Sequence, residues 1–280
     1  MKKPLLITTL TFLATINPLV LPLPMMVNGS ATAASRSPSL SSKLYVAPQP
    51  PDTGTPNGRT HGGSRGGCNA SDEAPPLTAL VPATKINKTT GMEKDVSETS
   101  ILTRLDLEFE QVWSYTTDAR PTLWFYSPYE LDGTTNVSFV LEDNAGNSYE
   151  HTFQPVTTAG IVSVTIPETV PELRVGDHYR WLFSMHCLPE EPDFVEGWVY
   201  RMEPDASLNA QISAATPQEQ ARLYAQNGIW QNALTRLAQL RQLEPDNEVV
   251  MTDWRSLLES VGLEVMAEEP FTDCCSTSES

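Results

Sequence analysis

Apolar and polar residues alternate through the middle of the chain, over residues 105–202. Successive side chains of a β-strand point to opposite faces, so this alternation is typical of strands with one buried face. Trp181 and Trp198 both stand at alternating aromatic positions with polar neighbours, and we expect both rings in the core. The pattern predicts strands over residues 77–81, 121–126, 137–141, 149–153, 161–166, 179–186 and 197–202.

Turn residues separate these predicted strands. Residues 142–147 are rich in Asn, Asp and Gly, which tolerate positive φ and favour a hairpin turn, and Pro167 stops the strand before it. Six to eight short strands with such turns predict a mainly β fold, either an Ig-like β-sandwich or a partly closed barrel.

The hydrophobic period changes from two to about 3.6 residues after Pro204, which predicts helices. Thr216 and Glu219 have the spacing of a helix capping box around Pro217, and Asn227-Gly228 favours the end of that helix. Two further helices carry apolar stripes. Their stripe residues are Trp230, Ala233, Leu234, Leu237 and Leu240 in one, and Val250, Trp254, Leu257, Leu258 and Val261 in the other.

The first two of these helices resemble one tetratricopeptide-like hairpin. A single hairpin cannot bury its own apolar face, so we expect this C-terminal helical subdomain to pack on the β domain. The alternative is a helical hairpin that binds a peptide itself, which predicts an uncovered groove beside Trp230 and Trp254.

The N-terminal residues have the pattern of a signal peptide. Lys2 and Lys3 precede an apolar run over residues 5–16, and small residues at Ala31 and Ala33 suit cleavage after Ala33 or Ala34. The run is shorter than the ~20 residues that cross a bilayer. We therefore expect a periplasmic or secreted protein with no membrane insertion after cleavage.

These patterns divide the chain into five predicted regions. Residues 1–34 are the signal peptide, and the Ser-, Pro- and Gly-rich residues 35–76 are expected to form a flexible arm, because they hold too few apolar groups to offset the entropy of ordering. The β-sandwich domain covers residues 77–203 and the helical subdomain residues 204–266, followed by a disordered tail over residues 267–280.

The chain is acidic, with a formal net charge of -17 at pH 7. Removal of the leader deletes two lysines and no acid, which gives about -19. A strongly acidic surface repels phosphate backbones, so nucleic acid is excluded as a partner.

Four cysteines in an exported chain raise the question of disulfides. Cys68 and Cys187 lie in or beside the folded body, and we expect them to pair, although four cysteines allow three pairings. The adjacent Cys274 and Cys275 can join only through a strained ring, so they are expected to stay free or to bridge another chain.

No cofactor or metal is expected. The glycine-rich residues 58–67, with Arg59 and Arg65, lack the strand, Lys-Ser/Thr ending and helix of a phosphate loop, so we expect Arg65 to bind backbone carbonyls. The four histidines show no metal-ligand spacing. The sequence also contains neither a Gly-x-Ser-x-Gly elbow nor a Ser-x-x-Lys motif.

Aromatic residues are the remaining candidates for binding. Residues 124–126 place aromatic rings on both faces of one strand, so one side is expected to be exposed. Trp124, Tyr126 and Tyr129, together with Arg65, are therefore our candidate ligand-binding residues, since such rings stack on sugars or hold a peptide strand.

Several motifs occur in an order that resembles a known family. They are Gly62-Gly63-Ser64-Arg65-Gly66-x-Cys68, Leu77-Thr78-Ala79-Leu80-x-Pro82, Pro121 to Tyr129, Tyr179-Arg180-Trp181-x-Phe183-Ser184, Cys187, Gly197-Trp198, Leu223 to Trp230, Trp254-x-x-Leu257-Leu258 and Val261-Gly262-Leu263. The chain resembles, over residues 59–263, a cyanobacterial exported family known only as a domain of unknown function, DUF number 928. The resemblance implies export and one module spanning the β and helical parts. It implies no activity, and Leu188-Pro189 stands where the family pattern has Asp-Pro.

Two classes of function remain. The first is a non-enzymatic binding or cell-envelope interaction protein, using a face or edge of the β-sandwich to bind an envelope protein or polysaccharide. The alternative is an envelope hydrolase acting on polysaccharide or peptide through the loop carboxylates Glu190, Glu191 and Asp193. A pocket with two carboxyls of raised pKa would favour the hydrolase, whereas an exposed aromatic strip or an unpaired sheet edge would favour the binder.

Overall fold

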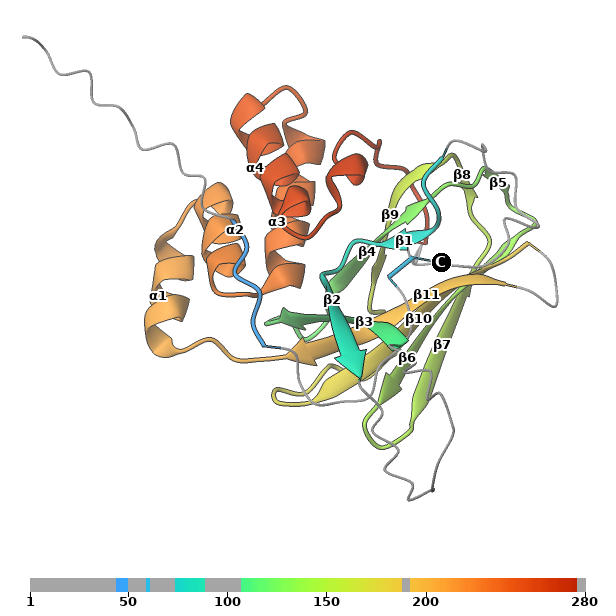
Figure 1. Ribbon diagram of the computed structural model, residues 1–280, viewed down its shortest axis with the longest axis horizontal. Coiled ribbons are helices and arrows are strands. Elements are labelled where there is room, and N and C mark those ends of the chain that lie inside the picture. The colour runs from blue at the N-terminus through green and yellow to red at the C-terminus, as the bar shows by residue number, and fades with distance from the viewer. Residues whose placement is uncertain (1–43, 50–58, 61–73, 89–106, 188–191, 276–280) are drawn as a thin grey trace, which may run out of the picture. The chain divides into compact units, whose positions relative to one another are not determined.

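The computed structural model describes residues 44–49, 59–60, 74–88, 107–187 and 192–275 (Figure 1). The chain divides into two units, Met1–Ser41 and Ser42–Ser280, and every described residue belongs to the second. Strands form the first part of this unit and helices the last part, as the change of period predicted. Among the described residues, no helix combines the length and the apolar composition that crossing a bilayer requires.

The larger sheet has six strands in the order β2-β3-β11-β10-β6-β7. Its neighbouring strands are antiparallel, except that β11 runs parallel to β3. The strands are β2 (Ala83–Lys88), β3 (Leu107–Thr116), β6 (Asn136–Asp143), β7 (Ser148–Phe153), β10 (His178–His186) and β11 (Asp193–Arg201).

A smaller sheet has the order β1-β4-β9, and a separate pair joins β5 to β8. Phe125 of β4 stacks on Phe183 of β10 with ring centroids 4.2 Å apart, so the two larger sheets face each other across an apolar core. The fold is mainly β, with open sheets rather than a closed barrel, and the Ig-like assignment stays a prediction. The strands are β1 (Thr78–Ala79), β4 (Thr122–Ser127), β5 (Leu131–Asp132), β8 (Val156–Thr157) and β9 (Gly160–Thr165).

Four α-helices and a short 3-10 helix follow the strands. They are α1 (Ala206–Ala214), α2 (Pro217–Gln226), α3 (Trp230–Leu243), α4 (Glu248–Glu259) and η1 (Glu264–Met266). The last three α-helices are those that the sequence predicted, and Gly228 has the positive φ of 73° expected at the end of α2. The helix α1, capped by Asp205, was not predicted. The tetratricopeptide-like assignment of α2 and α3 stays a prediction.

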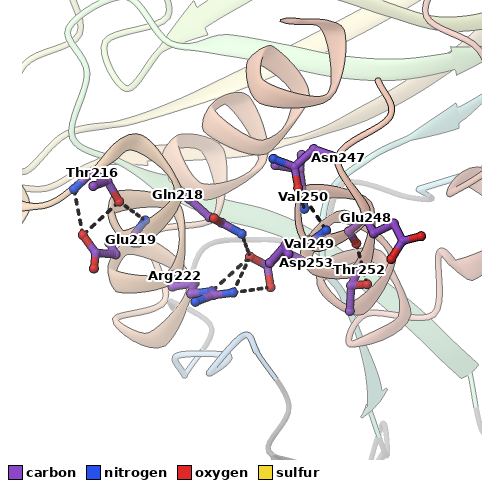
Figure 2. A network of polar contacts seen from close by, with 10 residues as sticks. All are labelled: Thr216, Gln218, Glu219, Arg222, Asn247, Glu248, Val249, Val250, Thr252 and Asp253. Atoms are coloured by element: carbon purple, nitrogen blue, oxygen red, sulfur yellow. Dashed lines mark hydrogen bonds and ion pairs between the residues drawn. The ribbon is translucent and has the colours of Figure 1, made fainter. Parts of the chain in front are cut away.

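Polar side chains hold α2 against α4, as Figure 2 shows. The Asp253 carboxylate of α4 accepts hydrogen bonds from Gln218 Nε2 at 2.8 Å and from Arg222 Nε at 3.0 Å. Asp253 is buried, and a buried carboxylate is tolerated only with such partners. The capping box of Thr216 and Glu219 is confirmed, and the hydrogen bonds from Thr216 lower the pKa of Glu219.

The helix α3 packs directly on the β part. Trp230 is fully buried, and its Nε1 donates a hydrogen bond to the Leu80 carbonyl at 2.8 Å. Gln231 Nε2 donates to Ser114 Oγ at 3.0 Å, and Asn232 Oδ1 accepts from the Thr117 backbone N–H at 2.9 Å. Three consecutive residues at the start of one helix therefore bind the sheets, and the two parts form one structural unit.

The described segment 44–49 lies within the stretch that we expected to be a flexible arm. The Tyr45 ring meets the Trp230 ring edge-on at 4.9 Å, and the Val46 backbone N–H donates to the Ala225 carbonyl at 3.1 Å. Burial raises the pKa of the Tyr45 hydroxyl. This short segment is thus packed against the helices, although its surroundings in sequence are rich in Ser, Pro and Gly.

Candidate functional site

The candidate aromatic residues of β4 and the loop after it lie in the core. Trp124, Tyr126 and Tyr129 are 4%, 2% and 5% exposed. Both faces of β4 are covered, because Phe125 packs in the sandwich core while Trp124 and Tyr126 pack toward the helices. The expectation that one side of residues 124–126 is exposed is therefore wrong, and a ligand reaches these rings only if the elements covering them move.

Trp198 lies on the opposite face of the larger sheet from Trp181. Trp181 is fully buried, as expected, and pairs across the strands with Gly197, whereas Trp198 pairs with Arg180 on the other face. The Trp198 ring meets the His178 ring at 5.2 Å and is partly exposed, so its expected core position is wrong. Alternation identified two faces but could not show which of them the second sheet covers.

Arg65 and Cys68 lie outside the described residues, so their expected roles stay predictions. Cys187 directly follows β10, and its pairing with Cys68 likewise stays a prediction. Arg59, near the start of the glycine-rich run, does bind a backbone carbonyl: its Nη1 donates to Val261 O at 2.7 Å. Burial lowers the pKa of its guanidinium. This bond joins the segment that precedes β1 to the turn that follows α4.

The carboxylates proposed for a hydrolase give that function no support. Glu190 and Glu191 lie outside the described residues, and Asp193 accepts a hydrogen bond from the Tyr129 hydroxyl. A general acid near neutral pH needs a raised pKa. Each described carboxyl whose pKa is clearly displaced is instead lowered, by hydrogen bonds to its charged form. These are Asp132, bonded by Thr134, Asp143 by Asn147, Glu219 by Thr216 and Glu268 by Arg255.

A cluster of two serines and one histidine lies on the larger sheet. Ser138 Oγ and Ser184 Oγ are 2.7 Å apart, and His186 Nε2 lies 3.2 Å and 3.1 Å from them. Acyl transfer also requires donors for an oxyanion, but these serines sit on regular strands whose backbone groups pair in the sheet. We read the cluster as a cross-strand hydrogen-bond network. Within the described ranges, no group of three or more His, Cys, Asp or Glu residues is arranged to hold a metal ion.

The outer edge of β9 carries the feature that sequence reasoning missed. The segment Pro270–Thr272, within the tail that we expected to be disordered, pairs with this edge through an isolated parallel bridge between Ile161 and Phe271. The Ile161 backbone N–H donates to Pro270 O at 2.7 Å, and the Thr272 backbone N–H donates to Ile161 O at 2.9 Å. Residues from the end of the chain thus extend the β1-β4-β9 sheet beyond β9. We call residues 270–273 the resident segment.

A glycine makes this close approach possible. A Cβ atom at position 160 would lie 2.6 Å from Pro270 O and 3.2 Å from Thr272 Cγ2. Gly160 also has a φ of +154°, which side-chain-bearing residues rarely adopt. The backbone of β9 therefore accepts an adjacent extended chain only because this residue has no side chain.

The Phe271 ring occupies an aromatic pocket between the smaller sheet and the helices. Its centroid lies 5.6 Å from that of Trp124 and 5.5 Å from that of Trp254, and the Arg241 guanidinium lies 4.9 Å above it. The Trp124 Nε1 donates to Thr235 Oγ1, and the Trp254 Nε1 donates to Ala267 O, so both indoles are fixed. We call Trp124, Trp254 and Arg241 the aromatic pocket.

One guanidinium nitrogen of Arg241 is buried without a hydrogen-bond partner among the described residues. Its Nη2 donates to Glu269 O at 3.1 Å, while its Nη1 is buried without a hydrogen-bond partner among the described residues. Burial lowers the pKa of this guanidinium. An unpaired buried donor is costly. The pocket therefore holds one costly unpaired donor beside the aromatic ring.

An open hollow of about 650 Å³ lies beside the C-terminal residues of the resident segment. Thr272 and Asp273 form part of its wall, and Thr272 Oγ1 lies 2.5 Å from Thr157 Oγ1. Beyond the hollow, Cys274 and Cys275 are buried, and the expectation that they stay free or bridge another chain stays a prediction. The remaining lining residues are Glu130, Leu131, Asp132, Val156, Thr157 and Thr158.

Comparison with known proteins supports the family to which the sequence pointed, while cyanobacterial origin and export stay predictions. No curated protein matches the chain. The model of one family, Domain of Unknown Function (DUF928), matches residues 60–271. This match covers most of the chain, including β1, β9, the aromatic pocket and Phe271. The chain therefore belongs to the DUF928 family.

Proposed function

We propose that this protein is an exported, non-enzymatic binding module of the cell envelope, which binds an extended polypeptide by adding it as a strand to the β9 edge. The resident segment occupies this site until a partner displaces it. Export to the periplasm or medium rests on the signal-peptide pattern of the N-terminal residues. An envelope protein fits this edge better than a polysaccharide does, because the edge offers main-chain hydrogen bonds in register.

One observation carries the proposal: the resident segment already makes every type of contact that such recognition uses. In strand addition, main-chain hydrogen bonds supply affinity and side-chain pockets supply specificity. Here Ile161 makes main-chain hydrogen bonds on both sides of Phe271, and the aromatic pocket holds the Phe271 ring.

The intramolecular position of the resident segment explains how the site is kept closed. A tethered segment acts at an effective concentration in the mM range for a short flexible connection. A free peptide with the same contacts therefore competes poorly with it. Displacement requires either a weaker resident segment or a partner whose contacts are better.

The substitution Phe271→Ala tests the proposal in the full chain. A labelled peptide with the sequence of residues 266–275, carrying serine at both cysteine positions, is expected to bind this variant at least tenfold more tightly than it binds the wild type. The reason is that the variant loses the aromatic anchor of the resident segment while the aromatic pocket stays intact. Fluorescence polarisation of the peptide measures the two dissociation constants.

Val265→Ala is the matched control. Val265 lies in the same C-terminal region but is 60% exposed, so its truncation should leave peptide binding at the wild-type value. If the peptide binds neither the Phe271→Ala chain nor the wild type at high protein concentration, the segment is a permanent part of the sheet and the proposal is wrong.

A further inference from the structure

The hollow next to the β9 edge shows what a displacing partner should carry. Along the resident segment, Phe271 lies in the aromatic pocket and Asp273, two residues later, lines the hollow. An extended peptide that follows the same path therefore places the side chain two positions after its aromatic residue at this hollow. The bound resident segment therefore determines which side chain of a peptide faces the hollow.

The hollow is negatively charged. Glu130, Asp132 and Asp273 line it, and its lining residues include no Lys, Arg or His. Hydrogen bonds from Thr134 lower the pKa of Asp132, so this carboxyl is ionised at neutral pH. The resident segment thus adds a third carboxylate to a hollow that already holds two, and a cation in its place would meet opposite charges there.

We propose that the β9 site selects an extended peptide with an aromatic residue followed two positions later by Lys or Arg. This inference rests on the proposed function and adds the chemistry of the partner. The aromatic ring replaces Phe271 in the aromatic pocket, and the cation takes the place of Asp273 beside Glu130 and Asp132. Exchange of a carboxylate for an attracted cation at this position lets such a peptide compete with the tethered segment. The net charge of -17 also attracts a basic partner over longer distances.

Two labelled peptides test the selection on the full Phe271→Ala chain. Both have the sequence of residues 266–275 with serine at the cysteine positions, and they differ only in carrying Asp or Lys at the position of Asp273. The Lys peptide is expected to bind about five- to tenfold more tightly at low ionic strength. The ratio should fall toward one in 0.5 M salt, because salt screens exposed charges.

The variants Glu130→Gln and Glu130→Gln with Asp132→Asn locate the effect. Each should reduce the ratio between the two peptides, and the single variant leaves the hydrogen bonds from Thr134 to Asp132 in place. Equal binding of both peptides to the Phe271→Ala chain, or a ratio that Glu130→Gln leaves unchanged, would overturn the selection and leave the proposed function standing. Absence of binding by both peptides would overturn the proposed function and this inference together.

Discussion

Replacement of Trp230 by alanine is expected to lower the free energy of unfolding by about 3–5 kcal/mol, the range seen when a fully buried tryptophan is truncated. Trp230 has no exposed surface, its ring packs on Tyr45, and its Nε1 is bonded to Leu80 O. The substitution leaves a large cavity and an unpaired carbonyl at the junction between the helices and the sheets. Chemical denaturation of the full chain, followed by circular dichroism, measures the change.

The same experiment tests whether the β and helical parts unfold together. Because α3 binds the sheets through Trp230, Gln231 and Asn232, strand and helix signals should be lost in one transition in the wild type. Leu243→Ala is the control, since Leu243 lies on the same helix but is 78% exposed and should change stability by less than about 0.5 kcal/mol. A Trp230→Ala chain as stable as this control would show that the helices do not depend on the sheets.

The second large effect is expected from Gly160→Ala. A Cβ atom at this position would collide with Pro270 O, so the resident segment must leave the β9 edge or the edge must distort. We expect a loss of about 1–3 kcal/mol in stability, as for other overpacked sites. In the Phe271→Ala background, the same methyl group should weaken binding of the 266–275 peptide at least tenfold, because the peptide needs the same close approach.

Gly176→Ala separates the clash from the cost of an unfavourable backbone angle. Gly176 has a φ of +87°, and a Cβ atom added there would meet no described atom within 4 Å, so alanine is strained at this position without a collision. We expect Gly176→Ala to reduce stability without changing peptide binding. If Gly160→Ala leaves the affinity for the peptide at the value of the Gly176→Ala chain, the peptide does not bind along β9.

The fold class followed from the sequence because periodicity reports it directly. The change from a two-residue period to a 3.6-residue period located seven strands and three of the four α-helices, and the capping box located the start of α2. The strands β2, β3, β5 and β8 were not predicted. The helix α1 was missed because only Leu208 and Ile212 are buried in it, which leaves no apolar stripe to detect. Periodicity also left the covered side of each sheet undetermined, which is why Trp198 was placed in the core.

The candidate site followed from the sequence only in small part. Trp124 was identified as a binding residue, but its ring is reached by Phe271, from a part of the chain 147 positions away that looked too polar to fold. One signal was present: Pro270-Phe271 is a lone apolar pair within an otherwise polar tail. Nothing in the local sequence connects that pair with Gly160, since their contact depends on how the two sheets and the helices pack.

The central claim is that the β9 edge holds the resident segment and can hold a partner in its place. Hydrogen exchange of the Ile161 backbone N–H, measured by NMR on the full chain, tests this claim most directly, because this N–H donates to Pro270 O. We predict slow exchange in the wild type, exchange at least tenfold faster in Phe271→Ala, and slow exchange again when the Lys peptide saturates that variant. Unchanged protection in Phe271→Ala, or fast exchange with the peptide bound, would contradict the account.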